Sequence, residues 1–229
     1  MTSSSAVIIG DSGGIGGAVA AAVATSGRFD VVHRLSRSAT GFDLEDEASI
    51  MAAAAQVAAG PTPTLVFVAT GVLHHGQVPE RSYKTMTAEH LLRDYRVNTV
   101  GPALVAKHFL PLLPRDRRAV FAALSARVGS ISDNRLGGWH SYRASKAALN
   151  MILKNLSIEI ARSHPQAVVA GLHPGTVATG LSAPFQKGVA EGRLFDAAYS
   201  AERLLAVLEG LGPTDSGGVF AWDGAVIPA

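Results

Sequence analysis

Short runs of β-forming residues alternate with helix-length stretches, and this alternation constrains the fold more than any other feature of the chain. Residues 6–9 and 65–69 are apolar throughout, as is typical of strands buried on both faces of a parallel sheet. Further strands are expected over residues 30–35, 41–44, 119–124, 167–172 and 218–222. Strands that alternate with helices pair in parallel and are covered on both faces. The sequence therefore predicts an α/β fold with a doubly wound parallel sheet of about seven strands.

The chain has 229 residues, of which 48% are hydrophobic and 17% charged, and it has no cysteine. We expect one domain over residues 1–229, because α/β domains commonly have this length and no linker or repeat divides the chain. The lack of cysteine excludes a disulfide scaffold, Cys-ligated zinc and a thiol nucleophile. The formal net charge is only +2, without a run of Lys or Arg, so no nucleic-acid partner is expected.

The first residues carry neither a basic region nor a long apolar stretch, and no apolar segment reaches the length that spans a bilayer. We therefore expect a cytoplasmic protein without a membrane partner. His74 and His75 are adjacent rather than spaced like metal ligands, so no metal site is expected.

The loop after the first expected strand is rich in glycine. It contains Gly10, Ser12, Gly13, Gly14, Ile15 and Gly16. Glycines permit a tight turn and let backbone N–H groups approach a pyrophosphate at the start of the next helix. The same residues match a G-x-S-x-G hydrolase elbow with Ser12 as nucleophile, but only one strand precedes them. A glycine turn without a ligand is a third interpretation, and the position favours a dinucleotide cofactor of the Rossmann type.

The end of the second expected strand carries Ser36 and Arg37 and no acidic residue. Dinucleotide folds place an acid here for the ribose of NAD, or a cation for the 2′-phosphate of NADP. Arg37 offers a permanently charged, bidentate contact and Ser36 a hydroxyl. The pair favours NADP, although a lone arginine could also be an ordinary solvated side chain.

Tyr142 and Lys146 lie four residues apart in a predicted helix over about residues 142–162, and therefore on one face of it. An unperturbed tyrosine, with a pKa of about 10, is a poor acid or base at neutral pH. We expect the nearby ammonium to lower the pKa of Tyr142 toward the working range.

Together these residues resemble the short-chain dehydrogenase/reductase family over essentially the whole chain. Five motifs follow the family's order: Gly10-x-x-x-Gly14-Ile15-Gly16, Asp43-Leu44, Val97-Asn98-x-x-Gly101, Tyr142-x-x-x-Lys146 and Pro174-Gly175-Thr176-Val177. Residues 125–131, 142–150 and 220–224 are similar to the C-factor-like and sniffer-like carbonyl reductase branch.

The resemblance implies an NADP-dependent oxidoreductase that acts on a small carbonyl or alcohol substrate. It makes Tyr142 the general acid or base, with Lys146 holding the ribose and Asn98 holding a water. Around the cofactor it places the pair Asp43 and Leu44 at the adenine, Ala69, Thr70 and Gly71 beside the adenosine, and Pro174, Gly175, Thr176 and Val177 on the nicotinamide side.

Three positions depart from the family pattern. Ile9 replaces a threonine, residues 69–71 replace Asn-Asn-Ala-Gly, and Ala126 stands where the catalytic serine is expected. Either Ser130, just past a glycine, or the adjacent Ser125 is expected to replace that serine, with Ser130 slightly favoured. The missing hydroxyl also leaves open an NADP-binding sensor without catalysis on the same fold.

The predicted helix over residues 142–162 is apolar around most of its axis, through Leu149, Met151, Ile152, Leu153, Leu156, Ile158 and Ile160. One side can pack on the sheet, and a partner subunit would cover the other. We therefore expect a homodimer or homotetramer. Trp139 and Phe185 are candidates for the substrate side, or for packing.

Overall fold

The computed structural model describes residues 3–74 and 78–229. Its centre is a six-stranded sheet in which every neighbouring pair is parallel. The strand order is β2 (Val31–Leu35), β1 (Ser4–Ile9), β3 (Thr62–Val68), β4 (Ala119–Leu124), β5 (Ala167–His173) and β8 (Val219–Ala221). This confirms the predicted doubly wound α/β fold.

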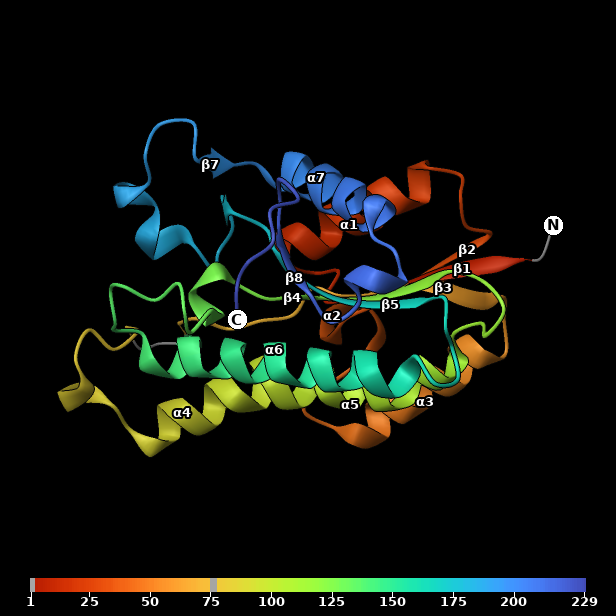
Figure 1. The fold of residues 1–229 in the computed structure, drawn as a ribbon, viewed down its shortest axis with the longest axis horizontal. Coiled ribbons are helices and arrows are strands. Elements are labelled where there is room, and N and C mark those ends of the chain that lie inside the picture. The colour runs from red at the N-terminus through yellow and green to blue at the C-terminus, as the bar shows by residue number, and fades with distance from the viewer. Residues whose placement is uncertain (1–2, 75–77) are drawn as a thin grey trace.

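Helices cover both faces of the sheet (Figure 1). On one face lie α1 (Gly14–Thr25) and α7 (Ala197–Gly210), and on the other lie α3 (Glu47–Ala58), α4 (Ala88–Tyr95), α5 (Gly101–Phe109) and α6 (His140–Ile160). A short helix α2 (Arg37–Thr40) follows β2, and a small separate sheet joins β6 (Thr176–Val177) to β7 (Leu194–Phe195).

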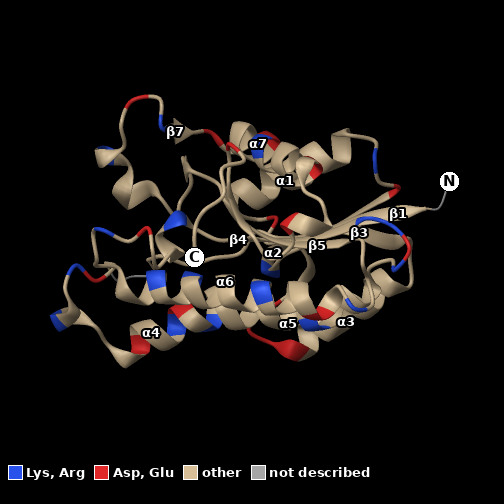
Figure 2. Cartoon of the chain, in the orientation of Figure 1, with Lys and Arg blue, Asp and Glu red and all other residues tan. Residues whose placement is uncertain are grey.

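Alternation along the central strands builds two apolar layers. In β1, Val7 and Ile9 pack toward α3, α5 and α6, whereas Ala6 and Ile8 pack toward α1 and α7. All four side chains are fully buried, as expected for the apolar part of a strand that is covered on both faces. Figure 2 shows that charged residues of both signs lie on the helices and loops around this nearly uncharged sheet.

The strand expected over residues 41–44 does not form, so the sheet has six strands rather than seven. Gly41 adopts a left-handed conformation at the end of α2, and the Asp43 carboxylate accepts a hydrogen bond from the Glu45 N–H. Asp46 then caps α3 by accepting from the Ala48 N–H. The segment is a turn into a helix because its polar groups bond locally instead of to a neighbouring strand.

The remaining expected elements form within a few residues of their predicted bounds. Helices α4 and α5 are joined by a π-helical turn over Arg96–Val100. Among the described residues, none of the helices is both long and apolar enough to cross a membrane.

Candidate active site

Two adjoining cavities open at the carboxyl ends of β1, β3, β4 and β5. One, of about 250 Å³, lies beside the ends of β1 and β2, and the other, of about 400 Å³, extends from the glycine loop to Tyr142 and Lys146. A third cavity of about 290 Å³ continues from Tyr142 toward the loop after β5. Ligands of open parallel sheets bind at this edge.

The glycine loop is too closely packed for side chains. Gly10 has φ 88°, and a Cβ on Gly16 would lie 2.2 Å from the Gly10 carbonyl oxygen. A Cβ on Gly14 would lie 2.7 Å from the Thr179 Cγ2. Ser12, Gly13, Gly14 and Ile15 line the cavity at the N-terminus of α1, where backbone N–H groups and the helix dipole favour an anion.

The 250 Å³ cavity is bordered by every residue that the sequence predicts for the adenosine side of the cofactor. It is lined by Ser36, Arg37, Asp43, Leu44, Ala69, Thr70 and Gly71, together with Gly10, Ser12 and Gly13. The Oγ of Ser36 and the Oγ1 of Thr70 are buried and have no hydrogen-bond partner among the described residues. Buried hydroxyls without a partner are uncommon in native structures, so these two fit a ligand that would bond them.

The side chain of Asn98 is bonded on all sides by the protein. Its Oδ1 accepts from the Val72 N–H at 2.8 Å, and its Nδ2 donates to the Val72 carbonyl at 2.9 Å and the Ser145 Oγ at 3.1 Å. These contacts fix the loop after β3 to α6. Asn98 lies in the π-helical turn, and both N–H bonds of its side-chain amide are used within the protein.

Tyr142 and Lys146 are both buried on the first turns of α6. The Lys146 Nζ donates to the Leu124 carbonyl at 2.8 Å and lies 5.9 Å from the centre of the Tyr142 ring. Burial lowers the pKa of Lys146 to about 8, although the Asp94 carboxylate acts in the opposite direction. Burial, and then Asp94, raise the pKa of Tyr142 above its usual range.

This direction of the Tyr142 pKa is opposite to the expected one, because burial and the Asp94 carboxylate both favour the neutral phenol. The phenol therefore keeps its proton at neutral pH in this structure. A protonated phenol is suited to donate a proton to an oxygen on which negative charge develops.

Two carboxylates behind Tyr142 were not predicted from the sequence. Glu80 accepts hydrogen bonds from Ser141, and Asp94 lines a small cavity of about 60 Å³ together with Glu80 and His90. Burial and the neighbouring Glu80 raise the pKa of Asp94 to about 6. Asp94 precedes Asn98 by one helical turn, but neither residue type nor spacing indicates that it shares a cavity with Glu80, because this arrangement depends on the tertiary fold.

The third cavity is mostly apolar. Tyr142 and Ala126 are at one end, and Pro174, Gly175, Thr176 and Val177 line it on the side of the loop after β5. The remaining wall includes Leu73, Val128, Trp139, Leu181, Phe185 and Val189. The ring centres of Trp139 and Phe185 lie 5.0 Å apart with a tilt of 55°, and both expected aromatic residues line this cavity.

The two candidate replacement serines have different surroundings. Ser125 borders the cavity, but its Oγ donates to the Asn150 Oδ1 at 2.6 Å. Ser130 is buried outside the cavity lining, where its Oγ accepts from the Asp133 N–H at 3.1 Å. The structure therefore brings Ser125, but not Ser130, to the cavity that contains Ala126 and Tyr142.

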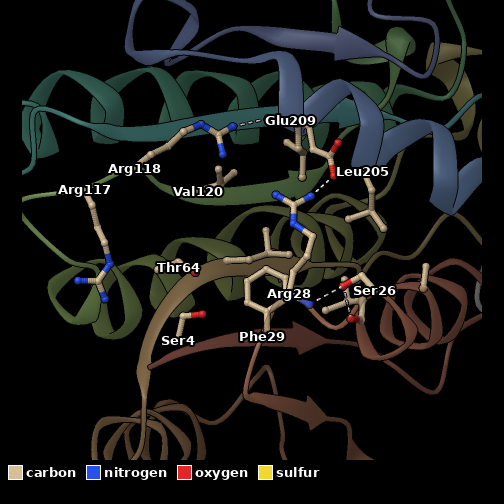
Figure 3. A pocket seen from close by; sticks show the side chains of 14 residues that line it. Ser4, Ser26, Arg28, Phe29, Thr64, Arg117, Arg118, Val120, Leu205 and Glu209 are labelled. Atoms are coloured by element: carbon tan, nitrogen blue, oxygen red, sulfur yellow. Dashed lines mark hydrogen bonds and ion pairs between the residues drawn. The ribbon is translucent and has the colours of Figure 1, made fainter. Parts of the chain in front are cut away.

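A separate cavity of about 340 Å³ lies at the opposite edge of the sheet, beside the starts of β1, β3 and β4 (Figure 3). Arg118 donates to the carbonyls of Leu208 and Leu211 at the end of α7, and Arg28 pairs with Glu209. These contacts fasten α7 to the sheet. Among the described residues, no three His, Asp or Glu side chains are grouped to hold a metal, and His75 lies outside those residues.

Comparison with known proteins assigns the family. The profile of the short chain dehydrogenases matches residues 4–190. An uncharacterized oxidoreductase of Schizosaccharomyces pombe is 33% identical over 144 residues, which cover 58% of this chain and 56% of that relative. C-signal of Myxococcus xanthus is 33% identical over 60% of this chain and 78% of its own length, in agreement with the C-factor-like branch.

A solved structure of carbonyl reductase from chicken fatty liver, with NADPH bound, superposes with a TM-score of 0.82. It is 25% identical and covers 100% of this chain and 99% of its own. The family profile, the parallel sheet with its glycine loop, and the buried Tyr142–Lys146 pair agree with one another. The chain belongs to the short-chain dehydrogenase family.

Proposed function

We propose that this protein is an NADP-dependent oxidoreductase that transfers hydride between the nicotinamide and a small carbonyl or alcohol substrate. One observation carries the proposal: Tyr142 lines both the cavity that begins at the glycine loop and the apolar cavity beyond it. A proton donor at this junction can reach a substrate oxygen while the substrate carbon faces the cofactor side.

The residues around the first two cavities fit a dinucleotide. Gly13 and Gly14 line the cavity at the N-terminus of α1, where the first backbone N–H groups of the helix can bind a pyrophosphate, and Asp43 and Leu44 border the adenosine cavity. Ser36, with its unpartnered hydroxyl, and the exposed Arg37 fit a 2′-phosphate. The NADPH held by the chicken carbonyl reductase supports the same choice.

The protonation states of Tyr142 and Lys146 support the proposed catalytic roles. Bound NADPH would supply the hydride, and the Tyr142 phenol would donate its proton to the substrate oxygen. Lys146, whose pKa of about 8 allows it to be charged at neutral pH, stabilises the phenolate that remains. Asn98 holds the loop after β3 against α6, which keeps Lys146 in place.

The apolar walls of the third cavity favour a small hydrophobic ketone or aldehyde over a charged substrate. We also propose a single catalytic domain over residues 1–229, a cytoplasmic location, and assembly into a homodimer or homotetramer. Met151 and Ile158, 61% and 52% exposed on α6, support the assembly, because an apolar helix face in water favours a partner.

A non-catalytic NADP-binding sensor is the second candidate, favoured only by Ala126 at the position of the expected serine. A screen of hydrophobic ketones, aldehydes and quinones for NADPH oxidation, with product identified by mass spectrometry, distinguishes the two. We expect at least one carbonyl to be reduced, and NADPH to be preferred to NADH. Tight NADPH binding without reduction of any carbonyl would favour the sensor.

A further inference from the structure

Among the described residues, both serines that line the apolar cavity donate their hydroxyls to other protein groups. Ser125 donates to Asn150, and Ser182 donates to the Val177 carbonyl. Ala126 has no polar side-chain atom. Reduction of a carbonyl places negative charge on the substrate oxygen, and a hydrogen-bond donor there typically contributes about 10²–10³ in rate. Another hydrogen-bond donor in the same cavity would therefore accelerate the reduction.

His173 lies on the strand next to the one that leads into Ala126. It is the last residue of β5, and the parallel register pairs Leu124 with Leu172, so the following residue of β5 lies beside the end of β4. The Ser125 N–H donates to the Leu172 carbonyl at 2.7 Å and maintains this register. His173 lines the same cavity as Ala126 and Tyr142.

The imidazole of His173 has hydrogen-bonding capacity that the protein does not use. Its Nδ1 is buried and has no hydrogen-bond partner among the described residues, and the half-buried residue lines the cavity. A buried polar atom without a partner costs free energy, and such atoms often mark a functional role.

The surroundings keep this imidazole neutral. Burial, and then the Arg127 guanidinium, lower the pKa of His173 to about 4, while Asp223 acts weakly in the opposite direction. A neutral imidazole carries one N–H, which can donate to an oxygen without introducing a positive charge. Arg127 is less suited to that role, because its Nη1 pairs with the Asp133 carboxylate at 3.0 Å.

We infer that an N–H of the His173 imidazole donates a hydrogen bond to the substrate oxygen and so supplies the contact that Ala126 cannot make. This inference rests on the proposed reductase function. His173 retains its proton throughout, whereas Tyr142 transfers its proton to the same oxygen. In this arrangement the substrate oxygen lies between the ends of β4 and β5 and the start of α6.

The test compares His173→Ala, His173→Gln, Ala126→Ser and the double variant His173→Ala/Ala126→Ser on the best carbonyl found. Kinetics give kcat and KM, and NADPH fluorescence titration gives the Kd. His173→Ala should lower kcat about 10²–10³-fold with NADPH Kd within about twofold. His173→Gln retains a side-chain N–H and should lose less. His108→Gln on α5, a part-buried histidine outside the active-site cavities, is the matched control.

Introducing the serine should restore what the histidine supplied. Ala126→Ser should raise kcat at least about tenfold more in the His173→Ala background than in the unmodified chain, because the two donors serve the same oxygen. Equal effects in both backgrounds would overturn the inference. A kcat for His173→Ala within threefold of the unmodified value would overturn it as well.

The inference can still be tested if His173→Ala does not fold. If that variant fails to bind NADPH, His173→Leu and His173→Gln replace it, since both nearly preserve side-chain volume. At least tenfold higher kcat for the glutamine variant supports the inference, and equal values contradict it. Absence of any carbonyl reduction by the unmodified chain contradicts the proposed function, whereas unchanged kcat in the histidine variants contradicts this inference alone.

Discussion

Glu80 accepts hydrogen bonds from Ser141 at the start of α6, the helix that carries Tyr142 and Lys146. The Ser141 hydroxyl and its backbone N–H both donate to this carboxylate, and the Trp139 N–H donates to the Glu80 carbonyl. The residue at the N-cap of this helix does not cap it. Trp139 occupies that position with φ 50°, and its indole has no acceptor for a helix N–H. A residue 61 positions away therefore holds the start of the helix that carries Tyr142 and Lys146.

Removing this remote cap should destabilise the fold. Burial raises the pKa of Glu80, but hydrogen bonds from the Ser141 hydroxyl and from the backbone, together with His90, hold this pKa below its usual value. Glu80→Ala leaves the buried Ser141 hydroxyl and the first-turn N–H without a partner, which should cost about 1–3 kcal/mol. Urea unfolding measures this cost. Glu89→Ala, an exposed acid at the same small cavity, is the control, and equal losses in both variants would disprove the cap.

Arg37 should determine the choice of cofactor. A hydrogen bond to a charged group contributes about 1.5–3 kcal/mol, so Arg37→Ala should weaken NADPH binding by about tenfold or more. NADH, which lacks the 2′-phosphate, should bind almost as before. Isothermal titration of both cofactors tests this, with the exposed Arg115→Ala as the control. Tighter binding of NADH than of NADPH by the unmodified chain would contradict the NADP assignment.

Asp94 should make stability depend on pH in a definite direction. Its pKa is raised to about 6 by burial and by Glu80, against His90, Arg93 and Lys146, so the folded protein binds more protons than the unfolded chain. Stability from this group is therefore full below the unfolded pKa and is lost as pH rises through about 6.

Asp94→Asn should remove this dependence. The variant should gain about 1–2 kcal/mol relative to the unmodified chain when pH rises from 4 to 7.5. Urea unfolding at both values measures the difference. Asp46→Asn, at the exposed cap of α3, serves as a carboxylate control. Parallel pH profiles of Asp94→Asn and the unmodified chain would show that Asp94 titrates normally.

The exposed apolar face of α6 should form the subunit contact. Leu149 and Leu153 are buried against the sheet, whereas Met151 and Ile158 point to solvent in the single chain. Met151→Glu/Ile158→Glu should lower the molar mass measured by light scattering from a dimer or tetramer to a monomer. The same pair of changes at Ala21 and Ala24, exposed on α1, should leave the mass unchanged. A monomeric unmodified chain would refute the assembly.

Features fixed by residues near one another in sequence could be predicted. The glycine loop and the i, i+4 spacing of Tyr142 and Lys146 are local, and both residues lie on α6 as expected. Helix α3 could have been found, because Asp46 caps it and Ile50, Ala53, Ala54 and Val57 follow helical periodicity. The strand expected over residues 41–44 directly precedes this pattern, and no helix was predicted there.

Features that depend on neighbouring strand ends could not be predicted. His173 meets the cavity of Ala126 only because β4 and β5 pair in register, and Glu80 reaches Ser141 only through the folded loop after β3. The placement of Ser130 away from the cavity depends on the 3₁₀ turn over Arg127–Gly129. The pKa direction of Tyr142 depends on burial, which spacing alone does not reveal.

The most direct measurement of the proposed reaction is carbonyl reduction by Tyr142→Phe under saturating NADPH. This variant keeps the ring that packs against Trp139 but removes the proton donor. We expect kcat to fall about 10²–10⁴-fold while the Kd for NADPH stays within about twofold. Full reductase activity in Tyr142→Phe, with normal cofactor binding, would contradict Tyr142 as the proton donor and with it the proposed mechanism.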